Sequence, residues 1–221
     1  MTLALTDPSP NFDSRPADGA VDMLVLHYTG MRSAADALDR MRDPSAKVSA
    51  HYMIDEDGTV RALVDESMRA WHAGVASWRG HADVNARSIG IELVNPGHEF
   101  GYRPFPEAQM ATLVGLAQEV LVRHDIPARN VVGHADVAPA RKEDPGELFD
   151  WRRLAESGIG LWPDAPRPGD GELGELLRRY GYASGDAAAV RAFQRHFRPA
   201  RVDGRGDAET AGLLRRLLAM I

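Results

Sequence analysis

Residues 21–28 read VDMLVLHY, and this run of aliphatic and β-branched side chains decides the fold. A short segment that is apolar on both faces predicts a strand buried inside a sheet. A Thr-Gly pair ends the run, and Ser33 with Asp36 then resembles a capping box that starts a helix continuing through Met41. The sequence therefore predicts a central strand followed by a helix.

The elements on the C-terminal side of this unit extend the same pattern. Residues 51–64 alternate around an Asp-Gly pair, which predicts two antiparallel strands joined by a tight turn. Residues 88–94, SIGIELV, predict another strand, Pro106 opens a helix through about Val122, and residues 130–133 predict a last short strand. Strands and helices mix without a strict βαβ repeat, so we expect an α/β domain with a mixed β-sheet flanked by helices.

Composition limits the class of protein. The chain has 221 residues, 44% hydrophobic content and a net charge of −6, which fits one main domain and a small appendage without a basic surface for nucleic acid. It has no apolar run long enough for a membrane segment and no export signal as written, so we expect a cytoplasmic monomer, or a periplasmic or envelope protein if an export segment is missing. Without cysteines, any metal must be held by His, Asp or Glu.

A change in composition divides the chain into two parts. Residues 159–171 collect prolines and glycines and predict a linker between a domain of residues 1–158 and a small three-helix domain of residues 172–221. Three helical patterns follow the linker, and Asp186 and Asp207 are suitable N-caps. A cut near residue 166 is therefore expected to leave two separable pieces.

Three candidate metal ligands lie far apart in the sequence. His27 ends the first strand, His134 ends the last strand, and Asp144 lies in the loop that follows. Strand ends are rigid, so two imidazoles and one carboxylate that converge there would form the open three-ligand site typical of catalytic zinc. Each residue alone has a structural explanation, because a lone strand-end histidine is usually structural and an Asp-Pro pair often starts a turn.

Five motifs occur together in one order: LHYTG, VSAHYMIDEDGTV, RAWHAG, SIGIELVNPG and GHADVAPARKEDPG. They closely resemble the type 2 N-acetylmuramoyl-L-alanine amidases, over about residues 21–154. The resemblance implies one Zn²⁺ per chain held by His27, His134 and Asp144, with His51 near the site but outside the ligand set. It also implies hydrolysis of the amide bond between the lactyl group of N-acetylmuramic acid, or its anhydro form, and the first alanine of the wall peptide.

Two further residues are assigned to the reaction by this resemblance. Glu92 matches the acidic residue that takes a proton as water attacks the amide, and Lys142 matches a cation beside the negative oxygen of the tetrahedral intermediate. Glu92 also stands out without the resemblance, because a carboxylate in an otherwise apolar strand is costly unless it is paired or functional. Lys142 alone could be ordinary solvated surface.

The resemblance also suggests where the substrate binds. Trp71, His72, Ala73, Asn85 and Ala138 are the predicted substrate-binding residues, since aromatic rings stack on sugars and His or Asn can bond a peptide or N-acetyl group. Trp71 could equally anchor a loop. The C-terminal helices resemble a peptidoglycan-binding domain, although their apolar residues are also those that any three-helix core requires.

Two other classes of function remain open from the sequence. A metal-free module that binds peptidoglycan without cutting it would lack stoichiometric zinc. An unrelated zinc peptidase would not explain the five motifs. The predicted substrate is peptidoglycan or a muropeptide, and the sequence leaves open whether intact wall, soluble muropeptide or the anhydro fragment is preferred.

Overall fold

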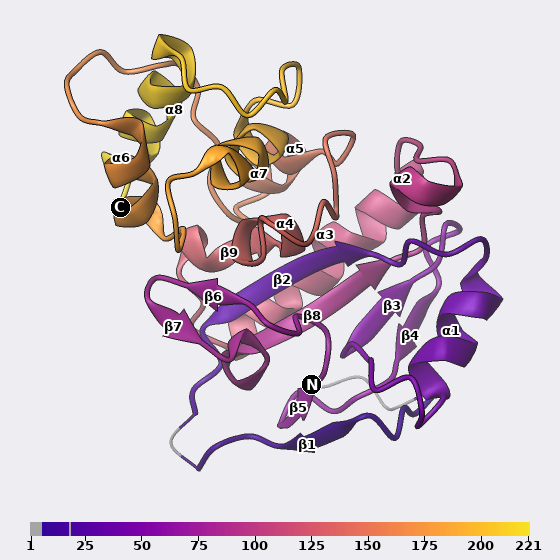
Figure 1. The fold of residues 1–221 in the computed structure, drawn as a ribbon. Helices are drawn as coiled ribbons and strands as arrows, with labels where there is room; N and C mark the ends of the chain where they lie inside the picture. The colour runs from indigo at the N-terminus through magenta and orange to yellow at the C-terminus, as the bar shows by residue number, and fades with distance from the viewer. Residues whose placement is uncertain (1–5, 18) are drawn as a thin grey trace.

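A five-stranded mixed sheet forms the centre of the molecule in the computed structural model, which describes residues 6–17 and 19–221 (Figure 1). The strand order is β4-β3-β8-β2-β9. β2 (Met23–Tyr28) lies parallel to β8 (Ser88–Leu93) and β9 (Val131–Gly133), and β3 (Tyr52–Ile54) is parallel to β8 and antiparallel to β4 (Val60–Ala62). The predicted mixed sheet, its central strand and its hairpin are confirmed.

One face of the sheet packs against the long helix α3 (Glu107–Arg123). Alternate strand residues point to this face because side chains in a strand alternate between its two sides. Helix α3 begins one residue later than predicted, with Pro106 at the N-cap. The apolar side chains that α3 shares with the sheet include Leu24, Leu26, Tyr52, Ile54, Ile89, Ile91, Leu113 and Val120.

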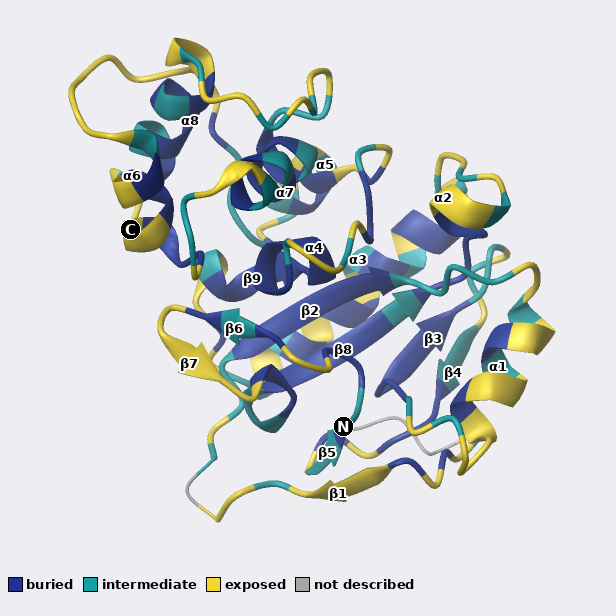
Figure 2. Ribbon diagram, in the orientation of Figure 1, coloured by how far each residue is buried: buried dark blue, intermediate teal, exposed yellow. Residues whose placement is uncertain are grey.

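The other face of the sheet carries shorter elements. Helix α1 (Ala34–Arg42) packs over β3, and its predicted N-cap Ser33 accepts a hydrogen bond from the amide of Asp36 at 3.1 Å. Helix α4 (His134–Val137) follows β9 directly and lies beside β2. Strand β3 and most of β2 and β8 are buried between these layers, whereas β4 at the edge of the sheet is mostly intermediate in exposure (Figure 2).

Several short elements lie outside the predicted pattern. They are too short to leave a clear periodicity in the sequence. They are β1 (Phe12–Ser14), β5 (Met68–Ala70), β6 (Ser77–Trp78), β7 (His81–Ala82), the 3-10 turns Val84–Arg87 and Ala128–Asn130, α2 (Gly97–Phe100) and α5 (Trp151–Glu156).

Three helices complete the chain after a segment, residues 159–171, that contains neither helix nor strand. They are α6 (Leu173–Tyr180), α7 (Ala187–Phe197) and α8 (Ala208–Leu218), and the predicted caps Asp186 and Asp207 accept hydrogen bonds from their first turns. No helix in the described part of the chain has both the length and the apolar character that crossing a bilayer requires.

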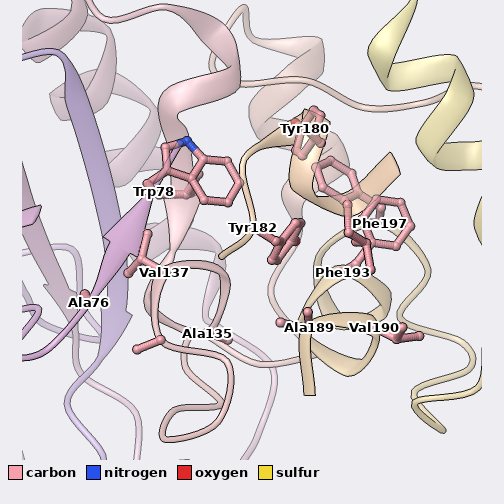
Figure 3. Close-up of a cluster of buried hydrophobic side chains, with 14 of the residues drawn as sticks. Ala76, Trp78, Ala135, Val137, Tyr180, Tyr182, Ala189, Val190, Phe193 and Phe197 are labelled. Carbon is pink, nitrogen blue, oxygen red and sulfur yellow. The ribbon is translucent and has the colours of Figure 1, made fainter. Parts of the chain in front are cut away.

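The C-terminal helices share a hydrophobic core with the α/β part (Figure 3). Trp78, only 1% exposed, has its ring 5.9 Å from that of Tyr180 and 5.2 Å from that of Tyr182. Val137 of α4 and Phe193 of α7 belong to the same cluster. This continuous packing argues against the expectation that a cut near residue 166 would leave two separable pieces, because either piece would expose buried apolar surface.

Candidate metal centre and active site

The three predicted metal ligands meet at one end of the sheet. His27 is the next-to-last residue of β2, His134 is the first residue of α4 after β9, and Asp144 lies in the following loop. His27 Nδ1 lies 3.0 Å from His134 Nδ1, and each of these nitrogens lies 3.1 Å from Asp144 Oδ2. All three side chains are buried, so the structure brings together the residues that could hold a metal ion.

The triangle of these three atoms fits a small cation. Four tetrahedral ligands at 2.0–2.1 Å from an ion are about 3.3 Å apart, close to the observed edges. His134 Nε2 lies 3.0 Å from the carbonyl oxygen of Ala73, which can only accept, so Nε2 carries the proton and Nδ1 is a bare lone pair. A bare nitrogen and a carboxylate oxygen at 3.1 Å repel each other unless a cation lies between them.

The backbone around β9 and α4 holds two of these ligands in place. The amide of Ala135 donates to the carbonyl of Asp144 at 2.9 Å, and the amide of Gly133 donates to Asp136 Oδ2 at 2.8 Å. A side chain at Gly133 would place its Cβ 2.7 Å from Pro145, so the close approach of the loop requires glycine. His134 and Asp144 are therefore fixed relative to each other by local structure.

Burial and charge shift the pKa values of His27 and Asp144 toward forms that bind cations. Burial lowers the pKa of His27 to about 4, with His134 adding to the effect and Asp144 opposing it. Burial alone would raise the pKa of Asp144, but the neighbouring His134 and His27 hold it well below its usual value. A neutral imidazole and an ionised carboxylate are the forms that ligate a metal.

Glu92 lies next to the ligands on the same face of the sheet. In the register of β2 and β8 it is the direct partner of His27, and neighbouring strands are about 4.8 Å apart. Its Oε2 atom is buried without a hydrogen-bond partner among the described residues. Burial raises the pKa of Glu92 well above its usual value, the charge of Asp144 adds to this, and Lys142 opposes it.

A cavity of about 440 Å³ opens over Glu92 and two of the candidate metal ligands, His134 and Asp144. Its wall includes three cationic residues, Arg40, Arg141 and Lys142. Arg141 is fixed by hydrogen bonds to the carbonyl oxygens of Ala73 at 2.8 Å and Val75 at 2.7 Å. The arrangement places a candidate metal site, a carboxylate and positive charge beside one cavity, which is suited to hydrolysis of an amide.

The five predicted substrate-binding residues do not all reach this cavity. Of the residues that line it within the described part of the chain, only His72 comes from this set. Ala73, Asn85 and Ala138 are buried, and Asn85 Oδ1 accepts hydrogen bonds from the amides of His72 at 3.2 Å and Ala73 at 2.8 Å. None of these three residues lines the cavity, so its lining gives no support for their substrate role. For Trp71 it stays a prediction.

His51, which the sequence places near the site but outside the ligand set, is also behind it. Its Nδ1 accepts from the amide of Gly90 at 2.9 Å, and its Nε2 lies 3.0 Å from Arg15. His51 is thus fully used within the sheet and does not enter the metal triangle.

Sequence reasoning missed an aromatic group at the rim of the cavity. The ring of His98 stacks on Tyr102 with 4.4 Å between centroids, and its Nδ1 lies 3.0 Å from the hydroxyl of Tyr28. Its Nε2 lies 3.2 Å from Glu147. The signal was present in NPGHEFGY, which places a histidine and aromatic rings in the loop directly after the strand of Glu92.

Sequence reasoning also missed contacts from α7, and from the loop that precedes it, to the segments of His134 and Asp144. Asp136, two residues after His134, accepts hydrogen bonds from the hydroxyl of Tyr182 at 2.6 Å and pairs with His196 at 2.7 Å. Arg195 pairs with Glu143, the neighbour of Asp144, at 2.5 Å. The C-terminal part of the chain therefore contacts the segments that carry two of the candidate ligands, His134 and Asp144.

Comparison with known proteins places this geometry in a family. Residues 17–147 match the family model described as N-acetylmuramoyl-L-alanine amidase. N-acetylmuramoyl-L-alanine amidase AmiD of Escherichia coli (strain K12) is 40% identical over 230 residues, covering 90% of this chain and 82% of the relative.

Solved structures give the same result over nearly the whole chain. AmiD from E. coli, in complex with anhydro-N-acetylmuramic acid-L-Ala-D-gamma-Glu-L-Lys, superimposes with a TM-score of 0.82 at 36% identity and covers 95% of this chain and 98% of its own. AmpDh3 from Pseudomonas aeruginosa has a TM-score of 0.84 at 35% identity and covers 98% of this chain and 99% of its own. With its family match, its sheet and its His-His-Asp triangle, the chain belongs to the type 2 N-acetylmuramoyl-L-alanine amidase family.

Proposed function

We propose that this protein is a zinc-dependent amidase that cleaves the bond between the lactyl group of an N-acetylmuramic or anhydro-N-acetylmuramic acid and L-alanine. The observation that carries the proposal is the triangle of His27, His134 and Asp144 beside the unpartnered carboxylate of Glu92. Two nitrogens and one oxygen leave a fourth position open, which is the ligand set typical of catalytic zinc.

Each side chain has a distinct part in this reaction. When bound, zinc would polarise the amide carbonyl and lower the pKa of a water molecule. Glu92 takes a proton from the attacking water and delivers it to the departing amine of L-alanine, and a carboxyl group with a raised pKa is well matched to that exchange near neutral pH. Lys142 provides a positive charge for the oxygen that becomes negative in the transition state.

A muropeptide is the substrate class that the comparisons support. The AmiD complex contains an anhydro-muramyl tripeptide, and a second AmpDh3 structure, at 35% identity, contains anhydromuramic pentapeptide. Carboxylates of a stem peptide are complementary to the cationic side chains in the wall of the cavity. We therefore propose soluble anhydro-muropeptides as the first substrates to test.

The alternative function is a recognition module that binds peptidoglycan without cutting it. Such a module would not require a carboxylate beside the candidate metal ligands, and a buried polar atom that lacks a hydrogen-bond partner among the described residues, such as Oε2 of Glu92, costs stability. The buried Oε2 atom of Glu92 therefore favours the enzyme.

The proposal is tested with the full-length protein and a purified anhydro-muramyl tripeptide. We expect about one zinc per chain by mass spectrometry of metals, and release of the free peptide detected by chromatography. His27→Ala and Asp144→Ala should each lose most of the zinc and the activity. Stoichiometric zinc without any peptide release would leave binding as the function, and absence of zinc from the active protein would refute the metal assignment.

The remaining expectations are proposals that need experiments of their own. We propose that residues 1–158 form the catalytic domain and that residues 172–221 form a helical domain joined by the segment between them. Wall binding by the helices is tested by sedimentation with insoluble peptidoglycan, the monomeric state by analytical ultracentrifugation, and the cytoplasmic location by cell fractionation.

A further inference from the structure

Behind the metal triangle, a chain of polar side chains runs from His27 into the sheet. His27 Nε2, the nitrogen that faces away from the triangle, lies 3.0 Å from His72 Nδ1. His72 Nε2 lies 3.1 Å from Ser88 Oγ, and Ser88 Oγ donates to the carbonyl oxygen of Val84 at 2.7 Å. His27, His72 and Ser88 are all buried, so water does not compete for these contacts.

The hydrogen bond from Ser88 to Val84 fixes which atom donates and which accepts in every other hydrogen bond of this chain. A serine hydroxyl has one proton, and Ser88 uses it on the carbonyl of Val84, which can only accept. Ser88 must therefore accept from His72, so the proton of His72 is on Nε2 and its Nδ1 is bare. The bare Nδ1 of His72 accepts a hydrogen bond from His27 Nε2, so the ring proton of neutral His27 is on Nε2 and its Nδ1 is bare.

The backbone of Ala73, the residue after His72, orients the other histidine ligand, His134. His134 Nε2 donates to the carbonyl oxygen of Ala73 at 3.0 Å, so its Nδ1 is bare as well. Asn85 Oδ1 accepts from the amides of both His72 and Ala73, which fixes the peptide between them. His72 and Ala73 thus orient the imidazoles of His27 and His134. Asn85 holds the backbone of both His72 and Ala73.

The sheet leaves room for this arrangement at one position. A Cβ at Gly90 would lie 2.5 Å from Cγ of the His72 ring, so only glycine allows the ring to lie against β8. Gly90 is two residues before Glu92 on the same face of the strand, because side chains alternate. The sequence SIGIE therefore supplies the carboxylate, the space for His72 and, at Ser88, the hydroxyl that directs it.

We propose that His72, Ser88 and Asn85 are positioning residues that set the tautomer of His27 and hold both histidine ligands with Nδ1 toward the metal. His72 acts through His27 and Asn85 through the backbone. This inference rests on the metal site proposed above and replaces the substrate role that the sequence suggested for His72, Ala73 and Asn85. Partners of this kind typically change metal affinity by about 10- to 100-fold.

The test compares two buried serines in the full-length, zinc-loaded protein. Ser88→Ala removes the hydroxyl that accepts the hydrogen bond of His72. Ser49→Ala is the matched control, because Ser49 also makes two buried hydrogen bonds but does not contact a ligand histidine. Its Oγ donates to the carbonyl oxygen of Asn11 and accepts from the amide of Trp71. Zinc affinity is measured by competition with a chelator, and thermal melting confirms that each variant is folded. We expect Ser88→Ala to bind zinc about 10- to 100-fold more weakly and Ser49→Ala to change affinity by less than about threefold.

A second measurement needs no variant. Long-range ¹⁵N–¹H NMR of the zinc-loaded wild type distinguishes protonated from bare imidazole nitrogens, and we expect His72 to carry its proton on Nε2. A proton on His72 Nδ1, or equal affinities of the two serine variants, would overturn the positioning role while leaving the zinc site intact. Failure of the wild type to bind zinc would instead overturn the proposed function.

Discussion

Removal of the C-terminal helices is expected to destabilise the α/β part, and the size of the effect follows from the face that they cover. A chain that ends at residue 158 would expose Trp78 and Val137, which are 1% and 2% exposed in the complete protein. Burial of a large apolar side chain contributes about 1.5–3 kcal/mol, so these two alone account for roughly 3–6 kcal/mol, as an upper bound. Domains have only about 5–15 kcal/mol of stability in total.

The assay compares the fragment of residues 1–158 with the full chain. At about 2–4 °C per kcal/mol, we expect a melting temperature lower by roughly 10 to 20 °C, together with binding of a hydrophobic dye. The same fragment carrying Trp78→Thr and Val137→Thr is the control, and it should bind less dye, because its exposed face is more polar. Cooperative melting of the unmodified fragment within about 3 °C of the full chain would refute the reasoning.

Three further predictions concern catalysis and pH. Glu92→Gln should lower kcat by about 10²- to 10⁴-fold with zinc content and KM near wild type, and loss of zinc from this variant would make Glu92 a ligand or its support. Lys142→Met should lower kcat by about 10²-fold, corresponding to roughly 3 kcal/mol, with zinc retained, and unchanged turnover would remove Lys142 from the mechanism. Burial raises the pKa of Glu66, but hydrogen bonds from Arg123, Tyr52 and His124 outweigh it and lower the pKa to about 2. Because the pKa of Glu66 is lower in the folded state, ionised Glu66 stabilises the fold above about pH 4.5, and this stabilisation is lost as the pH falls toward 2. In chemical denaturation, the free energy of unfolding of the wild type should therefore fall by about 2 kcal/mol more than that of Glu66→Gln between about pH 6 and pH 3.

The elements that carry strong local signals could be predicted from the sequence. Residues 21–28 have the apolar run of a buried strand, and Ser33, Asp186 and Asp207 are caps whose hydrogen bonds are present in the structure. His27, His134 and Asp144 could be named as candidate ligands from the sequence, because histidines at strand ends and the family motifs are visible without coordinates, and the structure places the three side chains together.

The parts that could not be predicted depend on contacts between distant residues. The pairing of Asp136 with Tyr182 and His196 joins residues 46 and 60 positions apart, and no periodicity records it. Trp78 belongs to a two-residue strand, and only its neighbours in space show that it fills a shared core. Prolines and glycines in residues 159–171 predict a linker, and this segment contains neither helix nor strand. They do not indicate how the parts that the segment joins pack against each other, because that packing depends on residues far apart in the sequence.

Contacts between distant residues also separate the residues of the motifs into two groups, those with a free hydrogen-bonding atom and those whose polar atoms are already paired. Glu92 has a buried oxygen that lacks a partner among the described residues and lies in the wall of the cavity, so its hydrogen-bonding capacity is free for a substrate. Both ring nitrogens of His72 are instead occupied, one by His27 and the other by Ser88. A motif gives both residues equal weight, since it records residue types and spacing. Only the positions of the hydrogen-bond partners distinguish the unpartnered Oε2 atom of Glu92, which we propose reacts, from the ring of His72, which we propose holds His27 in place.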